Sequence, residues 1–378
     1  MGNFASNFKK NFKIKNCLNW LVIAAVLILC IFLGNAGVLN RSTISLLSRI
    51  GYSIILAVSL NLVVGFLGEL SLGHAGFMCL GAYIGGYFAK EMGPKIGSQL
   101  VTLIIAMIIG GLVAAVFGFI IGLPALRLKG DYLAIVTLAF GEIVRNVFKN
   151  LELFGGAMGL QTKTYAPAKL FIVAFVVVII MLILVQNLIR SKHGRAVTAI
   201  RDNEIAAKAM GINVTFYKLF IFVVSAFFAG IAGTIYAHFT TPVLYTTFSY
   251  NFSIEILVMV VLGGMASVNG SIIAATLITV INFVLQNKLS GDLAAIRLLV
   301  YALILIVVVI FNNAPALKGI KEKFSLKFSA KQRPKKKKGK VTDDAAEWGV
   351  IESKIKMDAV FTPDLPRSEE KNEEGGDE

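Results

Sequence analysis

Long apolar runs separated by short polar breaks dominate residues 18–317 of the chain. Residues 170–189 are typical, because they contain no charged side chain and match the roughly 20 residues that cross a bilayer core. This pattern predicts about ten membrane-spanning helices, at residues 18–34, 44–66, 71–89, 99–122, 131–148, 168–189, 218–239, 253–265, 271–288 and 295–312. The segments 131–148 and 253–265 are short or interrupted, so a broken or partial span is an alternative for each.

Composition points the same way, since the chain is 56% hydrophobic and only 16% charged. Soluble domains carry about 25% charged residues. The cysteines Cys17, Cys30 and Cys79 have neither paired nor metal-like spacing, so no disulfide framework and no metal site is predicted. The predicted fold class is an all-α polytopic membrane protein.

The net charge of +15 raises the alternative of a nucleic-acid partner. Most of the excess lies in short loops and at the C-terminus, where membrane topology accounts for it, so we predict no nucleic-acid partner. Cations gather at residues 9–15, 127–129 and 190–218 and beyond residue 318, which favours both termini in the cytoplasm. Residues 35–37 are a poor cleavage site, so the first apolar segment is interpreted as a retained helix.

Three regions follow from these patterns: a basic cytoplasmic N-terminus at 1–17, a transmembrane domain at 18–317 and a charged tail at 318–378. The tail is basic over 318–340 and mainly acidic afterwards, which predicts a disordered cytoplasmic extension. Its basic part is interpreted as a stop-transfer cluster. Attraction to anionic membrane lipid is the first alternative, at about 1 kcal/mol per lysine. Nuclear localisation or RNA binding is the last alternative for this basic part of the tail.

The longest polar interval between spans is residues 191–216, SKHGRAVTAIRDNEIAAKAMGINVTF. Its part from 195 to 210 lacks Pro and Gly and is compatible with a helix. Asp202 or Asn203 is a predicted cap for a short helix that ends at Ala209, with Gly211 at the stop. A narrow apolar stripe beside Arg201, Glu204 and Lys208 is predicted at Val197, Ile200, Ile205 and Ala209. Such a helix suits docking to another protein; a connecting loop on the membrane surface is the alternative.

Four blocks of the chain resemble one known family. Glu204-Ile205-Ala206-Ala207, followed by Gly211, is similar to the EAA coupling motif of ABC-importer permeases, although Ile205 interrupts the usual spacing. The wider phrase GRAVTAIRDNEIAAKAMGIN resembles the LivM-type permeases of branched-chain amino acid transporters. Further blocks of that family resemble residues 61–82 (NLVVGFLGELSLGHAGFMCLGA), 130–144 (GDYLAIVTLAFGEIV) and 262–270 (LGGMASVNG). The resemblance extends from about residue 50 to residue 312.

The resemblance implies an ABC-importer permease fold and alternating-access import of leucine, isoleucine and valine across the bacterial cytoplasmic (inner) membrane. It also implies two cytoplasmic ATPase subunits, an extracytoplasmic substrate-binding protein and a second permease subunit; the resemblance favours a heteromeric pair, and pairing of the permease with itself stays the alternative. The sequence contains no G-x-x-x-x-G-K-[ST] phosphate loop, so ATP and Mg are expected on the ATPase subunits, and this chain is predicted to be neither an enzyme nor a cofactor carrier. The residues predicted to couple to the ATPases are Gly194, Arg195, Arg201, Asp202, Asn203, Glu204, Ala206, Ala207 and Gly211.

Small and polar residues within the spans are candidates for a translocation pathway. His74 is an ionisable residue at membrane depth and therefore a functional candidate, with a hydrogen-bonded structural role as the alternative. Glycines between residues 65 and 86 permit close helix packing or a helix break that lines a cavity. Glu142 is expected to pair with Arg145. The candidate pathway residues are Ser71, Gly73, His74, Tyr132, Thr137, Glu142, Gly263 and Gly264.

Competing functions remain open at this level. The nearest is a permease of the same superfamily for urea, short amides or other amino acids. A solitary secondary transporter or channel is a different class, disfavoured by the docking segment and by the lack of a recognisable coupling-ion site. A membrane scaffold that recruits a soluble partner through its tail would not need about ten spans.

Overall fold

The computed structural model describes residues 41–127, 131–162, 167–288, 302–303 and 306. The chain divides into two compact units, residues 1–313 and 314–378, and all described residues lie in the first. The predicted first span, most of the predicted last span, the basic N-terminus and the charged tail lie outside the described residues.

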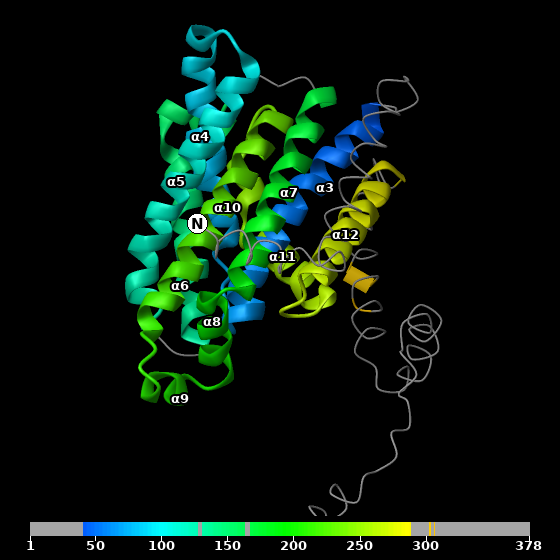
Figure 1. Cartoon of the computed structure of the whole chain (residues 1–378). Coiled ribbons are helices and arrows are strands. Elements are labelled where there is room, and N and C mark those ends of the chain that lie inside the picture. The colour runs from blue at the N-terminus through cyan, green and yellow to red at the C-terminus, as the bar shows by residue number, and fades with distance from the viewer. Residues whose placement is uncertain (1–40, 128–130, 163–166, 289–301, 304–305, 307–378) are drawn as a thin grey trace, which may run out of the picture. The chain divides into compact units, whose positions relative to one another are not determined.

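The described part of the chain is a bundle of helices without a β-strand (Figure 1). Its α-helices are α3 (Arg41–Asn61), α4 (His74–Ile96), α5 (Gln99–Ala125), α6 (Asp131–Asn150), α7 (Pro167–Arg190), α8 (Lys192–Asp202), α9 (Glu204–Ala209), α10 (Val214–Phe239), α11 (Tyr250–Gly263) and α12 (Val268–Lys288). A π-helix, η1 (Leu62–Leu67), continues α3, and short 3₁₀ turns are η2 (Glu152–Phe154), η3 (Gly156–Met158) and η4 (Tyr245–Phe248).

Five described segments are long and apolar enough to cross a membrane: Ser42–Leu67, Gln99–Ala125, Leu170–Arg190, Val214–Phe239 and Val268–Asn287. They confirm, within a few residues, the spans predicted at 44–66, 99–122, 168–189, 218–239 and 271–288. The predicted spans 71–89, 131–148 and 253–265 form α4, α6 and α11, which are not among the five. The expectation that 131–148 is short or interrupted is wrong, because α6 runs for 20 residues. Segment 253–265 is short as expected, since α11 has 14 residues.

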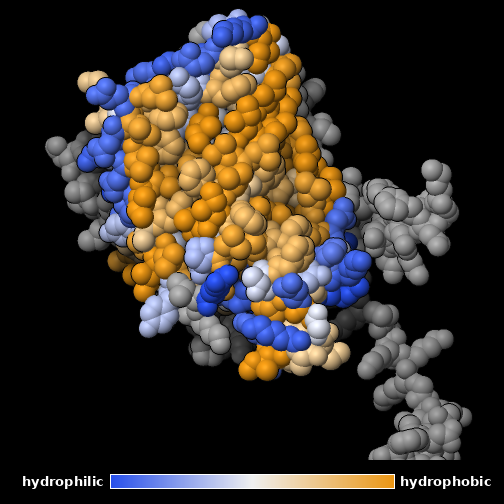
Figure 2. All heavy atoms as spheres, turned by 90° about the vertical axis from the view of Figure 1, so that its left-hand side faces the viewer, coloured by the Kyte–Doolittle hydropathy of each residue, from blue (hydrophilic) through white to orange (hydrophobic). Residues whose placement is uncertain are grey.

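The apolar helices differ in how deeply they are buried in the bundle. The 18-residue apolar window of Ser42–Leu67 is 100% buried and that of Val214–Phe239 is 72% buried, whereas the window of Gln99–Ala125 is only 33% buried. Figure 2 shows a broad apolar surface on the side of the bundle where α5 lies, with hydrophilic residues towards both ends. Exposed side chains of α5 include Leu100, Ile104, Ile108, Leu112, Val116 and Ile120. A contiguous apolar face of this size suits contact with lipid.

Glycines bring α4 and α10 into backbone contact. A Cβ atom at Gly81 of α4 would overlap the carbonyl group of Gly230, and one at Gly233 of α10 would overlap the carbonyl oxygen of Met78. Small residues permit this approach, because a helix interface without side chains lets the two backbones touch. The glycine series in this region therefore serves helix packing.

Two breaks in the helical pattern meet through Asn61, the last residue of α3. Its side-chain amide donates to the Ser271 hydroxyl group at 2.9 Å and accepts from the Ala266 backbone N–H at 3.0 Å. Ala266 lies in the turn between α11 and α12, whose first residue, Gly264, has a φ of 89°. Asn61 directly precedes η1, after which residues 68–73 are non-helical. The non-helical segments 68–73 and 264–267, which adjoin these contacts, are thus neighbours in space.

Candidate functional site

Residues 191–213 fold into two short helices because two side chains cap them. The Ser191 hydroxyl group accepts hydrogen bonds from the backbone N–H groups of His193 and Gly194, at 3.1 and 3.2 Å, and starts α8. Asn203 has an extended backbone, so it ends α8 and starts α9, where its side chain accepts from the Ala206 N–H at 3.0 Å. The predicted short helix is confirmed, with Asn203 rather than Asp202 as its cap.

The ends of this segment also follow from local sterics. Gly211 has a φ of 78°, a left-handed conformation that glycine adopts readily, and α9 stops just before it. At the other end, a Cβ atom on Gly194 would overlap the carbonyl oxygens of Leu188 and Ile189. Gly194 therefore lets α8 begin directly against the end of α7.

The predicted apolar stripe does not form a single surface. Val197 and Ile200 of α8 are buried, at 2% and 3% exposure, whereas Ile205 of α9 is 82% exposed. The extended backbone at Asn203 changes the direction of the chain, so α8 and α9 do not share one face. Helix α8 consequently anchors the segment in the bundle, and α9 presents Ile205 and the equally exposed Met210 outward.

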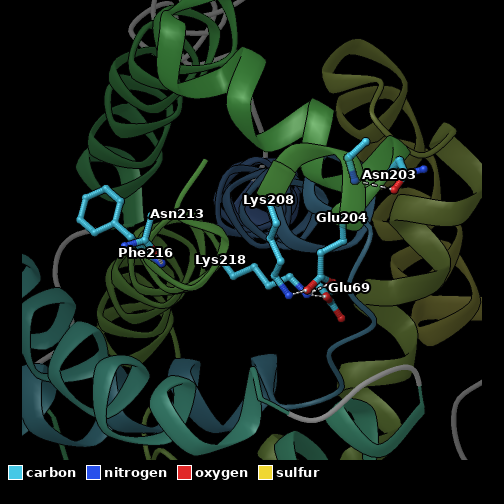
Figure 3. Close-up of polar contacts among 8 residues, drawn as sticks. Glu69, Asn203, Glu204, Lys208, Asn213, Phe216 and Lys218 are labelled. Carbon is cyan, nitrogen blue, oxygen red and sulfur yellow. Dashed lines mark hydrogen bonds and ion pairs between the residues drawn. The ribbon is translucent and has the colours of Figure 1, made fainter. Parts of the chain in front are cut away.

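Glu69, Glu204, Lys208 and Lys218 form an ion-pair cluster, here called the Lys218 cluster (Figure 3). The Lys218 ammonium group of α10 bonds to Glu69 in the loop after η1, and to Glu204 of α9 at 3.0 Å. Lys208 bonds to the other oxygen of Glu204 at 2.7 Å. The Lys218 side chain is only 7% exposed, and a charge so enclosed requires partners. The cluster therefore ties α9 to α10 and to the loop before α4.

The Lys218 cluster has a defined pH dependence. Hydrogen bonds from Lys208 and then Lys218 hold the pKa of the Glu204 carboxyl group below its ordinary value, although partial burial opposes them. Because the pKa is lowered on folding, the stabilisation is fully present above the ordinary glutamate value of about 4.3 and is lost as the pH falls below it. We expect the melting temperature of wild type to exceed that of Glu204→Gln by a constant margin between pH 8 and about pH 5, and the margin to shrink at lower pH. A margin independent of pH would contradict this assignment.

Arg201 connects α8 to the π-helix. Its guanidinium group donates to the Gly65 carbonyl oxygen at 3.2 Å and pairs with Asp202 at 3.0 Å. The arginine side chain lies against Gly68, where a Cβ atom would be only 2.7 Å from the arginine Cγ. π-Helical turns are rare and are often found at functional sites. Here the π-turn lies between α8 on one side and the Ala266 turn on the other.

A second polar group lies in the interior around the start of α4. The His74 ring nitrogen Nε2 is 2.8 Å from the Ser59 hydroxyl oxygen, and the backbone carbonyl of Ser59 accepts from Ser225 at 2.6 Å. The Ala75 N–H donates to the Ser253 hydroxyl group at 3.1 Å. These buried contacts join α3, α4, α10 and α11, so His74 has a hydrogen-bonded structural setting.

The predicted pathway residues fall into separate groups. Ser71, Gly73, His74 and Thr137 gather at the non-helical entry to α4, where the Leu72 N–H donates to the Thr137 hydroxyl group at 3.0 Å. Ser71 is 1% exposed, and its hydroxyl group has no hydrogen-bond partner in the described part of the chain.

The remaining pathway candidates lie elsewhere. Glu142 pairs with Arg145 at 2.9 Å, as expected, and also accepts from the first N–H of α11 at 3.0 Å. Tyr132 is 69% exposed and stands apart from the buried group. Gly263 packs on Gly270 at the turn between α11 and α12. The assignment of these residues to a translocation pathway stays a prediction.

Sequence reasoning missed three residues of the site, Glu69, Lys218 and Asn61. Glu69 and Lys218 are 149 positions apart, a separation that neither helical periodicity nor local spacing can bridge. A usable signal was present, because each charge adjoins a long apolar run and must find a partner or reach water.

Among the residues that the structure describes, five span-length apolar segments and a wide apolar surface define a multi-pass helical membrane protein. The chain belongs to the family described as the permease component of the branched-chain amino acid transport system, whose sequence model matches residues 42–309.

Two relatives carry the name high-affinity branched-chain amino acid transport system permease protein LivM. The protein from Salmonella typhimurium is 36% identical over 274 residues, which cover 64% of this chain and 63% of the relative. The protein from Escherichia coli is 35% identical over 296 residues, which cover 69% and 67%. The chain thus spans about two thirds of the length of these curated relatives. No solved structure matches it.

Proposed function

We propose that the protein is the permease subunit of an ATP-driven importer that carries leucine, isoleucine and valine across the bacterial cytoplasmic membrane. The observation that carries this proposal is the exposed helix α9, fixed by the Lys218 cluster to the membrane helices of a chain in the branched-chain amino acid permease family. An exposed short helix with Ile205 and Met210 on its surface suits insertion into a cleft of another subunit.

The contacts of this segment suggest how force would enter the bundle. ATP-driven motion of the docked subunit displaces α9 and α8 together. Lys218 passes the displacement to α10 and Glu69, and Arg201 passes it to the π-turn at Gly65. Asn61 then links that turn to the turn between α11 and α12. Alternating access follows if these two breaks rearrange with the docked subunit.

The complex that this mechanism requires has two ATPase subunits, which hold ATP and Mg, a second permease subunit and an external substrate-binding protein. Helices α8 and α9 then mark the cytoplasmic side, which agrees with the basic residues of the 190–218 interval. Both chain termini are proposed to lie on that side. The permease itself catalyses no reaction.

Glu204→Arg is expected to reduce ATP-dependent uptake of radiolabelled leucine by the reconstituted importer. The change places a third cation beside Lys208 and Lys218 and thereby opens the contact between α9 and α10. We expect a loss of about tenfold or more, the range that site-to-site coupling energies of 1–3 kcal/mol produce. Association of the ATPase subunits should fall in the same samples.

Glu152→Arg is the matched control, since Glu152 is exposed in η2 and its replacement should leave uptake unchanged. Uptake by Glu204→Arg at the wild-type rate would contradict the coupling role. Wild-type uptake without any ATPase subunit would replace the proposal with a solitary transporter. ATP-dependent uptake of urea or another solute instead of leucine would correct the substrate alone.

A further inference from the structure

A polar pocket with a volume of about 320 Å³ lies between α3, α10, α11 and α12. Helix α10 begins at Val214, just after α9, and its last turns contribute Tyr236 and Phe239 to the lining. This part of the pocket is therefore remote from α9. At 1.5 Å per residue, these residues are more than roughly 30 Å along the helix from its start. This part of the pocket therefore lies nearer the membrane side opposite the proposed ATPase contact.

Arg49 of α3 gives the pocket one charged wall. Its Nη1 atom donates to the Gln286 side chain at 2.8 Å, and its guanidinium carbon lies 5.5 Å from the centre of the Phe239 ring. The Nε atom is buried and has no hydrogen-bond partner among the described residues. A guanidinium group offers N–H donors in a planar fork that matches a carboxylate. Arg49 is thus held in place by the Gln286 contact, while its Nε–H group makes no hydrogen bond to a described residue.

Glu255 and Thr279 give the pocket acceptor groups. Glu255 of α11 accepts from the Asn282 amide at 3.1 Å and lines the pocket with its carboxylate. Thr279 of α12 is 7% exposed, and its hydroxyl group has no hydrogen-bond partner in the part of the chain that the structure describes. A buried hydroxyl group without a partner is unfavourable, so a polar ligand atom that reached it would be stabilised. An ammonium group has three donors and suits such acceptors.

The rest of the lining combines aromatic or apolar residues, among them Tyr52, Phe252 and Met259, with the hydroxyl-bearing residues Ser53, Thr240 and Thr247. The volume is at the lower end of the range of about 300–1,000 Å³ that is typical of small-molecule sites. A ligand that uses every wall carries a carboxylate, an ammonium group and a small apolar side chain. A zwitterion places donor groups against Glu255 and Thr279 and acceptor groups against Arg49.

We propose that this pocket binds the zwitterion of an α-amino acid with an aliphatic side chain. Arg49 receives the carboxylate, and Glu255 with Thr279 receives the ammonium group. The inference rests on the proposed function, which it deepens by giving the imported amino acid a site within the permease.

Equilibrium binding of radiolabelled leucine tests the pocket in the purified complex of permease and ATPase subunits, without the binding protein. Isovalerate, which lacks the ammonium group, and isopentylamine, which lacks the carboxylate, serve as competitors. Arg49→Gln is expected to weaken leucine and isovalerate at least tenfold and to leave isopentylamine unchanged. Glu255→Gln is expected to weaken leucine and isopentylamine and to leave isovalerate unchanged. Thr279→Val should weaken leucine severalfold.

Thr276→Val is the matched control on α12, because the Thr276 hydroxyl group already donates to the Ile272 carbonyl at 2.8 Å and does not line the pocket. It should bind leucine like wild type. Size-exclusion profiles and melting temperatures identify any variant that fails to fold, and the milder Thr279→Val then carries the test.

ATP-dependent leucine uptake by the same wild-type complex, with the binding protein added, separates the two proposals. Uptake without saturable leucine binding, or with equal affinities in wild type and all pocket variants, overturns the pocket and leaves the proposed function intact. Equal weakening of all three ligands by Arg49→Gln also overturns it, since a specific contact must discriminate among them. Pocket-dependent leucine binding without uptake supports the pocket and overturns the importer.

Discussion

Gly81→Ala is expected to prevent the stable packing of α4 on α10. The added methyl group would overlap the backbone of Gly230, which cannot move without displacing α10 as a whole. Overpacking against a side chain costs about 1–3 kcal/mol, and a clash with helix backbone belongs to the larger losses of about 4 kcal/mol or more. The measurement is the yield of monodisperse protein in detergent and its melting temperature.

Gly93→Ala is the matched control, because the same change in the same helix meets only Thr102, at an ordinary contact distance of 3.6 Å. Alanine stabilises a helix by about 0.5–1 kcal/mol relative to glycine, so this variant should be neutral or slightly more stable. Equal stability of the two variants would show that α4 and α10 do not pack as closely as described.

Lys218→Met is expected to have the second large effect. The substitution keeps the apolar stem but leaves Glu69, with its side chain 15% exposed, without its ammonium partner. Removing one member of a buried ion pair costs about 3–5 kcal/mol, and the partial exposure of both carboxylates places this case near the lower limit. Glu204 retains Lys208, so the loss falls mainly on the contact with the loop before α4.

A lower melting temperature and weaker association of the ATPase subunits would both report this loss. Adding Glu69→Gln to Lys218→Met should recover part of the stability, because the uncompensated carboxylate is then removed. Lys192→Met, at an exposed position at the start of α8, should change stability by less than about 0.5 kcal/mol. An Lys218→Met variant as stable as Lys192→Met would mean that the ion pairs contribute little.

The membrane-spanning class and the short helix α9 were predictable from the sequence because their causes are local. Apolar runs of sufficient length define the spans, and the Asn203 cap and Gly211 stop lie within the segment that they delimit. The division of the apolar stripe was not predictable, because it depends on the extended backbone of one residue, Asn203. In the sequence alone, Asn203 is equally compatible with a position inside one longer helix that would join α8 and α9.

The partners of the charged residues depend on tertiary structure. Glu255 lines a pocket beside Asn282, which belongs to the next helix. The link from Asn61 to Ala266 spans 205 positions and requires that two separate helix breaks meet. Composition shows that a charge at membrane depth needs a partner, and only the packing of the helices decides which one it has.

The Lys218 cluster also determines how this permease can be recombined with others. Residues 191–216 look like a transferable unit in the sequence, but Glu69 and Lys218 lie outside them and supply the contacts to the bundle. A chimaera that exchanges only residues 191–216 would bring Glu204 into a host without its partners. If α9 docks to an ATPase as proposed, redirecting the protein to a different ATPase requires exchanging residues 191–216 together with Glu69 and Lys218.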